Sequence, residues 1–177
     1  RRVCRRAGVS PGAFIPCLLV VSFDPAAAAP YLSGRLADAG ARVIKVERPE
    51  GDFARDYDHL VHGESAYFVW LNRGKESLRL DLKTDEDATL LRTILRKADI
   101  FIQNLAPGAA RRLGFGHDML RAATDRLLTV SISGYGADGP YPGRKAYALL
   151  VQADTGRPEI TRHPGQPARV GASVADM

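Results

Sequence analysis

Short apolar segments, rich in β-branched residues, alternate with segments of helical periodicity along most of the chain, and this alternation is what most constrains the fold. The strand-like segments are residues 18–23, 41–47, 77–81, 99–103 and 127–133. Helical patterns occupy residues 31–39, the segment after Thr84, and residues 109–113, 117–123 and 146–153. This order predicts an α/β fold with a mostly parallel sheet flanked by helices and joined by right-handed crossovers.

Thr84 carries a helix start signal. Its hydroxyl can accept a hydrogen bond from a backbone N–H of the first turn. The acids Asp85, Glu86 and Asp87 follow it and suit the positive end of the helix dipole. We therefore expect a helix to begin directly after Thr84.

Length and charge favour one domain behind a basic tail. The chain has 177 residues, enough for one domain with a proper core. Four arginines before residue 7 supply four of the net charge of +5 and leave +1 for the rest, too little for a broad polyanion-binding surface. We expect residues 1–16 to be an irregular basic tail and residues 17–177 to form one domain. The arginines and the apolar run after them also imitate a secretory signal, and the competing interpretation is a buried first strand at residues 17–23.

Cysteines and histidines give no pattern for a cross-linked or metal-bound fold. Cys4 and Cys17 lack a partner pattern, so neither a disulfide framework nor a zinc site is expected, and the default location is a reducing, cytoplasmic compartment. His59 and His62 have a spacing that suits metal ligands, but no third ligand lies nearby, which favours a solvated loop. No apolar run is long enough to span a bilayer.

Residues 134–139, GYGADG, have the spacing of a dinucleotide-binding fingerprint after a strand. That fingerprint needs a helix N-terminus to present its amides to the pyrophosphate. Pro140 and Pro142 follow instead, so the segment is expected to remain a loop. Glu47, at the end of the second strand, is the one feature that favours a nicotinamide coenzyme.

Basic residues follow the strands at corresponding positions. Arg48 ends the second strand, Lys83 follows the third, Arg112 the fourth, and Arg144 and Lys145 the fifth. In a parallel sheet these positions approach the carboxyl edge, where α/β proteins bind ligands. Several cations at one edge suit a small molecule with several phosphates.

Asp176 lies in a small, apolar, glycine-containing segment, GASVADM, at residues 171–177. No basic residue follows Arg169. These surroundings suit a carboxylate that reacts, and they equally suit one that caps a helix.

Six motifs occur in a fixed order: LADAGARVIKVERPEGD at residues 36–52, NRGK at 72–75, LDLKT at 80–84, DIFIQNLAPG at 99–108, LGFG at 113–116 and SISGYGADGPY at 131–141. Together they resemble the class III CoA-transferases, also called the carnitine dehydratase and bile-acid-inducible protein F family. The resemblance covers residues 18–177. It implies a Rossmann-like CoA-binding domain at residues 17–177, an incomplete version of the interlocked-ring CoA-transferase fold in which the second domain is absent.

The resemblance also assigns functional residues. It implies that Asp176 is the catalytic carboxylate. It places the contacts to CoA on Arg48, Leu80, Asp81, Leu82, Lys83, Asn104, Leu105, Ala106, Arg112, Arg144, Lys145, Ala146 and Tyr147. Its substrates would be an acyl-CoA and a carboxylic acid, with no tightly bound cofactor, metal, nucleic acid or membrane, and the full-length form would be an interlocked homodimer.

The chemistry that the resemblance implies is CoA transfer through an aspartyl anhydride and an aspartyl-CoA thioester. Three departures from the family accompany it. The chain is less than half as long as family members. Ala148 stands where many relatives carry Asp. Residues 24–30 lack the glycine that relatives place before the proline at position 30. The alternatives are an acyl-CoA racemase or dehydratase-type member and a noncatalytic truncated CoA-binding module. The lack of histidine between His117 and His163 argues against racemization.

Overall fold

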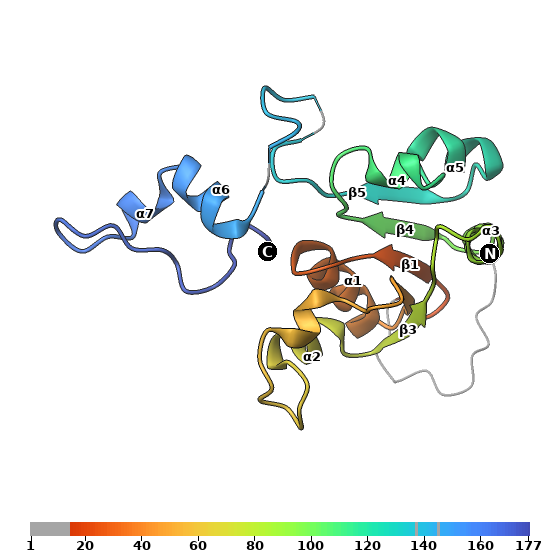
Figure 1. The fold of residues 1–177 in the computed structure, drawn as a ribbon, viewed down its shortest axis with the longest axis horizontal. Helices are drawn as coiled ribbons and strands as arrows, with labels where there is room; N and C mark the ends of the chain where they lie inside the picture. The colour runs from red at the N-terminus through yellow and green to blue at the C-terminus, as the bar shows by residue number, and fades with distance from the viewer. Residues whose placement is uncertain (1–14, 137, 145) are drawn as a thin grey trace. The chain divides into compact units, whose positions relative to one another are not determined.

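The computed structural model of the chain describes residues 15–136, 138–144 and 146–177 (Figure 1). It contains two compact units, Arg1–Ile132 and Ser133–Met177, and each is treated by itself. The expected basic tail therefore lies outside the described residues, except for its last two positions.

The first unit is built on a parallel sheet. Its strands are β1 (Leu19–Phe23), β2 (Arg42–Glu47), β3 (Lys75–Arg79), β4 (Ile100–Gln103) and β5 (Leu128–Ser131). Their spatial order is β3-β2-β1-β4-β5, with every neighbouring pair parallel. The predicted α/β fold with a mostly parallel sheet is thus confirmed. Because the strand order reverses direction beside β1, the loops after β1 and β4 leave the sheet at a switch point, where such folds bind ligands.

Helices connect the strands. In this unit they are α1 (Ala28–Asp38), the 3₁₀ helix η1 (Phe53–Asp56), α2 (Ala66–Asn72), α3 (Asp85–Leu95), α4 (Ala109–Arg112) and α5 (His117–Ala123). Four of them, α1, α3, α4 and α5, lie where the sequence pattern predicts helices, whereas η1 and α2 were not predicted. Thr84 caps α3 and accepts a hydrogen bond from the backbone N–H of Asp87, which confirms the predicted helix start.

Each face of the sheet has its own apolar core, because successive residues of a strand point to opposite faces. On one face, Val21 and Phe23 of β1 pack with Phe101 and with Leu91 and Leu95 of α3. The rings of Phe23 and Phe101 meet edge to face, with their centroids 5.1 Å apart. On the other face, a second core joins three strands to α1; its buried members are Val20, Ala29, Ala41, Val43 and Ile102.

The second unit holds α6 (Ala148–Asp154) and α7 (Arg157–Ile160). The expected helix at residues 146–153 is present but starts two residues later, and α7 was not anticipated. Inside this unit the side-chain oxygen of Gln152 accepts a hydrogen bond from the backbone N–H of Val170, so that α6 holds the segment before the C-terminal residues.

Two further expectations concern the cysteines and membrane-spanning segments. The expectation that the cysteines form no disulfide framework concerns Cys4 and Cys17, and Cys4 lies outside the described residues. Among the described residues, none of the helices is long and apolar enough to cross a membrane.

Phe101 tests the packing of the first core. It is 2% exposed and touches the ring of Phe23. We expect Phe101→Ala to lower the free energy of unfolding by about 3–5 kcal/mol, because a buried ring is lost and a cavity remains. Urea unfolding followed by circular dichroism measures this. Leu60→Ala, at a side chain that is 81% exposed, serves as the control and should change it by less than about 0.5 kcal/mol. Equal effects of the two substitutions would contradict this packing.

Candidate functional site

A cavity of about 550 Å³ opens at the carboxyl ends of β1, β2 and β3 in the first unit. Part of its wall is apolar and comes from the core, and part is the polar turn that follows β2. Its lining residues are Phe23, Pro25, residues 45–53, residues 80–83, Leu105 and Leu113. The cavity therefore lies at the sheet edge where the sequence predicted an anion site.

Six of the residues that the resemblance assigned to CoA line this cavity: Arg48, Leu80, Asp81, Leu82, Lys83 and Leu105. Asn104 and Ala106 flank Leu105. The side-chain amide of Asn104 donates to the Pro25 carbonyl at 2.9 Å and so joins the loops after β1 and β4 at the switch point. Its Oδ1 is buried without a hydrogen-bond partner among the described residues.

The other assigned residues are not part of the cavity lining. Arg112 ends α4, is exposed, and lies beside Gly108. Arg144, Ala146, Tyr147 and Asp176 belong to the second unit. Lys145 lies outside the described residues.

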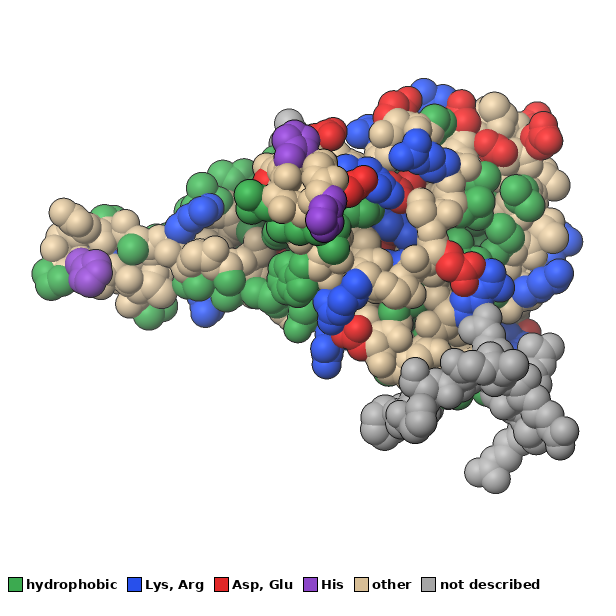
Figure 2. Space-filling view, turned by 90° about the horizontal axis from the view of Figure 1, so that it is seen from below, with side chains coloured by type: hydrophobic (Ala, Val, Ile, Leu, Met, Phe, Trp, Pro, Cys, Tyr) green, Lys and Arg blue, Asp and Glu red, His purple; other side chains and the backbone are tan. Residues whose placement is uncertain are grey.

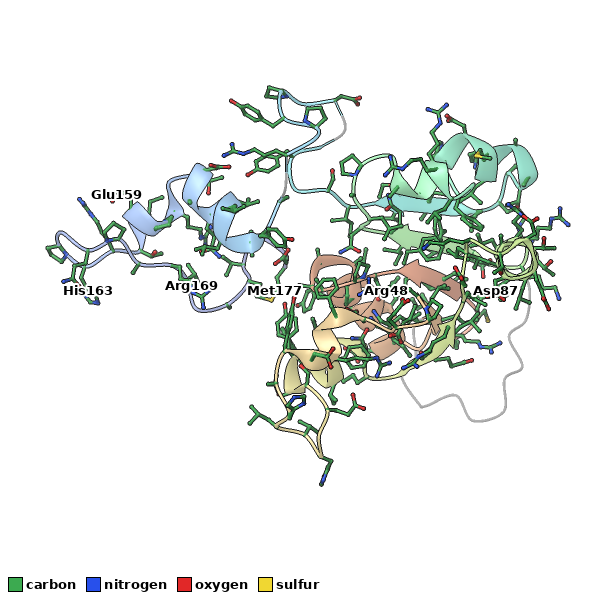
Figure 3. The ribbon with its side chains drawn as sticks, viewed as in Figure 1. Arg48, Asp87, Glu159, His163, Arg169 and Met177 are labelled. Atoms are coloured by element: carbon green, nitrogen blue, oxygen red, sulfur yellow. The ribbon has the colours of Figure 1, made fainter. Side chains whose placement is uncertain are left out.

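Arg48, labelled in Figure 3, follows β2 and opens a tight turn. Its Nε donates to the carbonyl of Gly51 at 3.0 Å, and the N–H of Gly51 donates back to the Arg48 carbonyl at 2.9 Å. Gly51 has a φ of +87°, a conformation that favours glycine. Only a distant contact of 3.8 Å links Arg48 to Glu50, and the Arg48 side chain is 62% exposed. Its outer guanidinium nitrogens are thus placed to meet a ligand.

Lys83 lies across the cavity at the start of the α3 cap. Its backbone N–H donates to Asp81 Oδ1 at 3.0 Å, while the Asp81 N–H donates to Asp87 Oδ2 at 2.7 Å. Leu80 is tied to β2 through a hydrogen bond from its N–H to the Glu47 carbonyl at 2.9 Å. The 80–83 segment therefore has a fixed backbone and an exposed ammonium group.

Lys45 lies inside β2 and is the centre of a buried ionic network that sequence reasoning missed. Its side chain is only 3% exposed. Nζ donates to Asp24 Oδ1 at 2.8 Å, to the Asp24 carbonyl at 2.7 Å and to Asp52 Oδ2 at 2.8 Å. All three ammonium hydrogens have acceptors, which is the condition for keeping such a charge inside a protein.

Lys75 brings a second ammonium group to Asp24. Its Nζ lies 3.0 Å from Asp24 Oδ2 and also donates to the Pro30 carbonyl and to Asn72 Oδ1, each at 2.9 Å. Burial lowers the pKa of Lys75 to about 8, with Asp24 opposing the shift. Burial acts to raise the pKa of Asp24, but Lys45 and Lys75 outweigh it, so that the pKa of Asp24 lies below its usual value. The two lysines and two aspartates are balanced in charge.

Glu47 is held by four donors. Oε1 accepts from Arg55 Nη2 at 2.8 Å and from Ser77 Oγ at 2.7 Å, and Oε2 accepts from Arg55 Nε at 3.0 Å and from the Asp52 N–H at 2.9 Å. Burial alone would raise the pKa of Glu47, but the hydrogen bonds from Arg55, Ser77 and Asp52 lower it to about 2. Nicotinamide-dependent Rossmann enzymes use an acid at this position to bind the ribose. Here the Glu47 carboxylate already accepts hydrogen bonds from Arg55, Ser77 and Asp52. The one feature that favoured a nicotinamide coenzyme is therefore used in contacts within the protein.

In the second unit, Arg144 is paired internally. Its Nη1 lies 3.0 Å from Asp154 Oδ2, and its guanidinium lies 5.7 and 5.6 Å from the ring centroids of Tyr135 and Tyr141. Tyr135 also donates its hydroxyl to Asp154. Gly134 allows this loop to approach Ala146, since a Cβ on Gly134 would lie 2.0 Å from the Ala146 Cβ.

Asp176 lies in a turn at residues 174–176. Its backbone N–H donates to the Ser173 carbonyl at 2.9 Å. The residue is partly buried, and burial raises the pKa of its carboxyl group above the usual value.

Charges of both signs are interspersed on the face of the first unit that Figure 2 shows. This face therefore carries no broad field of one sign, and the exposed cations of the cavity lining are the individual side chains Arg48 and Lys83. Among the described residues, no three His, Cys, Asp or Glu side chains gather in a way that could hold a metal ion.

Comparison with known proteins fits this geometry. The family model of CoA-transferase family III matches residues 18–177. The chain belongs to CoA-transferase family III. The resemblance inferred from the six motifs is thereby confirmed.

Three similar proteins illustrate the relationship. Acetyl-CoA:oxalate CoA-transferase of Acetobacter aceti is 40% identical over 163 residues, which cover 90% of this chain and 42% of the relative. Succinate–glutarate CoA-transferase of Agrobacterium fabrum is 37% identical over 167 residues, 89% of this chain and 42% of the relative. The crystal structure of a CaiB/BaiF family protein from Brucella suis superposes with a TM-score of 0.90 at 35% identity, covering 94% of this chain and 46% of that one. The chain thus spans less than half the length of these relatives.

Glu47 gives a test of the network with a defined pH dependence. We expect Glu47→Gln to lower the free energy of unfolding at pH 7 by about 1–3 kcal/mol, because a charged acceptor of four hydrogen bonds is lost. Since the pKa of Glu47 is lowered on folding, its contribution is complete above about 4.5 and is lost as the pH falls to about 2. The difference between the two proteins should shrink across that window in denaturant titrations.

Glu64→Gln is the matched control, since Glu64 contacts the same Arg55 at 3.6 Å but its side chain is 54% exposed. It should cost less than about 0.5 kcal/mol at every pH. A Glu47→Gln deficit that stays constant down to pH 2 would contradict the assigned role of the carboxylate.

Proposed function

We propose that this chain binds CoA in the cavity at the carboxyl edge of its sheet and takes part in the transfer of CoA between an acyl-CoA and a carboxylic acid. The observation that carries the proposal is the convergence, in one cavity, of six residues that the family resemblance assigned to CoA. The positions of Arg48 and Lys83 after the second and third strands had also suggested that edge as an anion site.

The cavity offers both kinds of contact that CoA requires. Phosphates form charge-assisted hydrogen bonds, for which the exposed groups of Arg48 and Lys83 are suited. The apolar wall, with Phe23, Val46 and Leu80 among its members, can cover the less polar parts of the ligand. A site of this volume with a few placed cations and an apolar wall suits an anionic, partly apolar small molecule.

Asp176 is the proposed nucleophile. Its carboxylate attacks the thioester carbonyl of the acyl-CoA, giving a mixed anhydride and the CoA thiolate. The thiolate then attacks the aspartyl carbonyl of the anhydride, which releases the donor acid as a carboxylate and leaves an aspartyl-CoA thioester. The acceptor carboxylate attacks this thioester and expels the thiolate, which attacks the acceptor's acyl carbon to form the new acyl-CoA and free Asp176.

The raised pKa of Asp176 bears on this chemistry. A more basic carboxylate is a stronger nucleophile once ionised, and only the ionised form attacks. The rate of the first step should therefore fall as the pH drops through the raised pKa. Backbone amides near a glycine-containing segment, such as residues 171–177, can approach an oxyanion closely.

The substrate class follows from the relatives. Oxalate, succinate and glutarate, which their names contain, are small dicarboxylic acids. We propose that this chain likewise acts on a small dicarboxylic acid, either as the acid released from the donor CoA thioester or as the acceptor of CoA. Assembly as a homodimer and a cytoplasmic location complete the proposal for the full-length form.

Asp176→Asn tests the covalent step. Incubated with succinyl-CoA, the unmodified chain should carry a CoA adduct on the peptide that contains Asp176. The variant should form it at least about 10³-fold more slowly while binding CoA with unchanged affinity. Peptide mass spectrometry and calorimetric titration measure the two properties.

Glu159→Gln is the control, because Glu159 is an exposed acid of the same unit that pairs with Arg162. It should leave adduct formation unchanged. An adduct that persists in Asp176→Asn would refute the nucleophile assignment. Binding of CoA with no adduct in the unmodified chain would refute the transfer activity of this chain and favour a noncatalytic CoA-binding module.

Arg48 and Lys83 test the phosphate site. We expect Arg48→Ala and Lys83→Ala each to weaken CoA binding by about 10- to 100-fold, because each removes a charge-assisted hydrogen bond. Lys97→Ala is the matched control: Lys97 is exposed but lies between α3 and β4, at the amino edge of the sheet. Equal affinity of all three variants would contradict the site.

A further inference from the structure

The cavity and the buried ionic network meet at the turn formed by residues 48–51. This turn lines the cavity along its whole length and carries Arg48 at its first position. It is closed by the two hydrogen bonds between Arg48 and Gly51, but its other side chains are exposed, as the 72% exposure of Glu50 shows. The turn therefore depends on its neighbours to hold Arg48 in one place.

Asp52, directly after the turn, supplies that anchor. Oδ2 accepts from Lys45 at 2.8 Å, Oδ1 accepts from the N–H of Ala54 at 3.0 Å, and the Asp52 N–H donates to Glu47 Oε2 at 2.9 Å. The Asp52 side chain is only 2% exposed. Through these three bonds the turn is tied to β2 on one side and to η1 on the other.

Lys45, which donates to Asp52, is itself held in place by the rest of the ionic network. Asp24 accepts from Lys45, from Lys75 and from Ser33 Oγ, the last at 2.6 Å. These partners come from β2, β3 and α1, so the position of Lys45 is determined by three elements of the fold. A cation held this way can fix Asp52 without adding net charge to the site, because its own charge is balanced.

Electrostatics and positioning make opposite predictions for Asp52. As a negative charge beside an anion site, Asp52 opposes phosphate binding, and its removal should strengthen it. As the anchor of the turn, Asp52 reduces the cost of ordering Arg48 when the ligand binds, and its removal should weaken it. The sign of the effect therefore distinguishes the two roles.

We propose that Asp52 is a positioning residue that, through Lys45, fixes the turn bearing Arg48 and thereby sets the affinity of the cavity for the phosphates of CoA. This inference rests on the proposed CoA site. It assigns to a buried acid a favourable effect on anion binding.

Asp52→Asn keeps the size of the side chain but replaces one acceptor oxygen by a donor, so that either Lys45 or the Ala54 N–H loses its partner. We expect calorimetric titration with CoA, and with adenosine 3′,5′-bisphosphate as a phosphate-bearing fragment, to show about tenfold weaker binding of both. Asp52→Glu keeps the charge but shifts the carboxylate by one methylene. It should weaken binding as well, and it supplies the result if the amide variant does not fold.

Two controls separate the possible causes. Glu86→Gln removes one negative charge from an exposed position in the first turn of α3, outside the cavity lining and the network, and it should leave CoA affinity unchanged. Leu120→Ala removes a buried side chain of α5 that belongs neither to the cavity lining nor to the ionic network, and it should lower stability but not affinity.

Unchanged or tighter CoA binding by folded Asp52→Asn would overturn the inference. So would an equal loss of affinity in Leu120→Ala, since general destabilisation would then account for both. A failure of the unmodified chain to bind CoA would instead overturn the proposed function itself, and with it the site on which Asp52 acts.

Discussion

The ion pair of Lys45 with Asp24 and Asp52 is the interaction on which the ligand-binding edge depends. A lone ammonium group in the middle of a buried strand would be costly, and it is tolerated here because each of its hydrogens meets an acceptor. Lys45 thus draws the end of β1 and the segment after β2 together. The same arrangement that satisfies its charge shapes one wall of the cavity.

The sheet topology explains why the ligand-binding residues lie where they do. In the order β3-β2-β1-β4-β5, the loops after β1, β2, β3 and β4 all leave at the carboxyl edge. They bring an apolar floor from the core and exposed cations from the turns into one cavity. The Rossmann-like fold is shared with nicotinamide-binding enzymes, but here Glu47 is held by Arg55, Ser77 and Asp52. The cations Arg48 and Lys83, which also line the cavity, are the phosphate contacts that we propose instead.

Sequence patterns predicted those features that depend on neighbours along the chain. The alternation of segments gave the parallel α/β fold, the hydroxyl of Thr84 and the acids after it gave the start of α3, and the residues after strands gave Arg48 and Lys83. The third strand was placed two residues too late, at 77–81. The structure has Lys75–Arg79, because pairing with β2 determines the register.

The features that were missed depend on contacts between distant segments. Lys45 and Asp24 are 21 positions apart, and no local rule names an acid as partner of a given lysine. The signal that could have found the network is a lysine between Ile44 and Val46, inside a strand that is buried on both faces. Arg144 shows the converse: a loop cation that a pattern assigns to phosphate is paired with Asp154 in the structure. The helix α7 has only four residues, too few for an apolar period, although Pro158 in its first turn is a helix start signal.

The CoA site that we propose lies at the carboxyl edge of the sheet, between the turn after β2 and the segment before α3. Amide chemical-shift changes in a ¹⁵N-labelled chain titrated with CoA would locate it. The largest changes should fall on residues 48–53 and 80–83, with little change at the amino edge around Lys97 and Asp99. Shifts concentrated at the amino edge, or a titration that leaves both lining segments unperturbed, would contradict it.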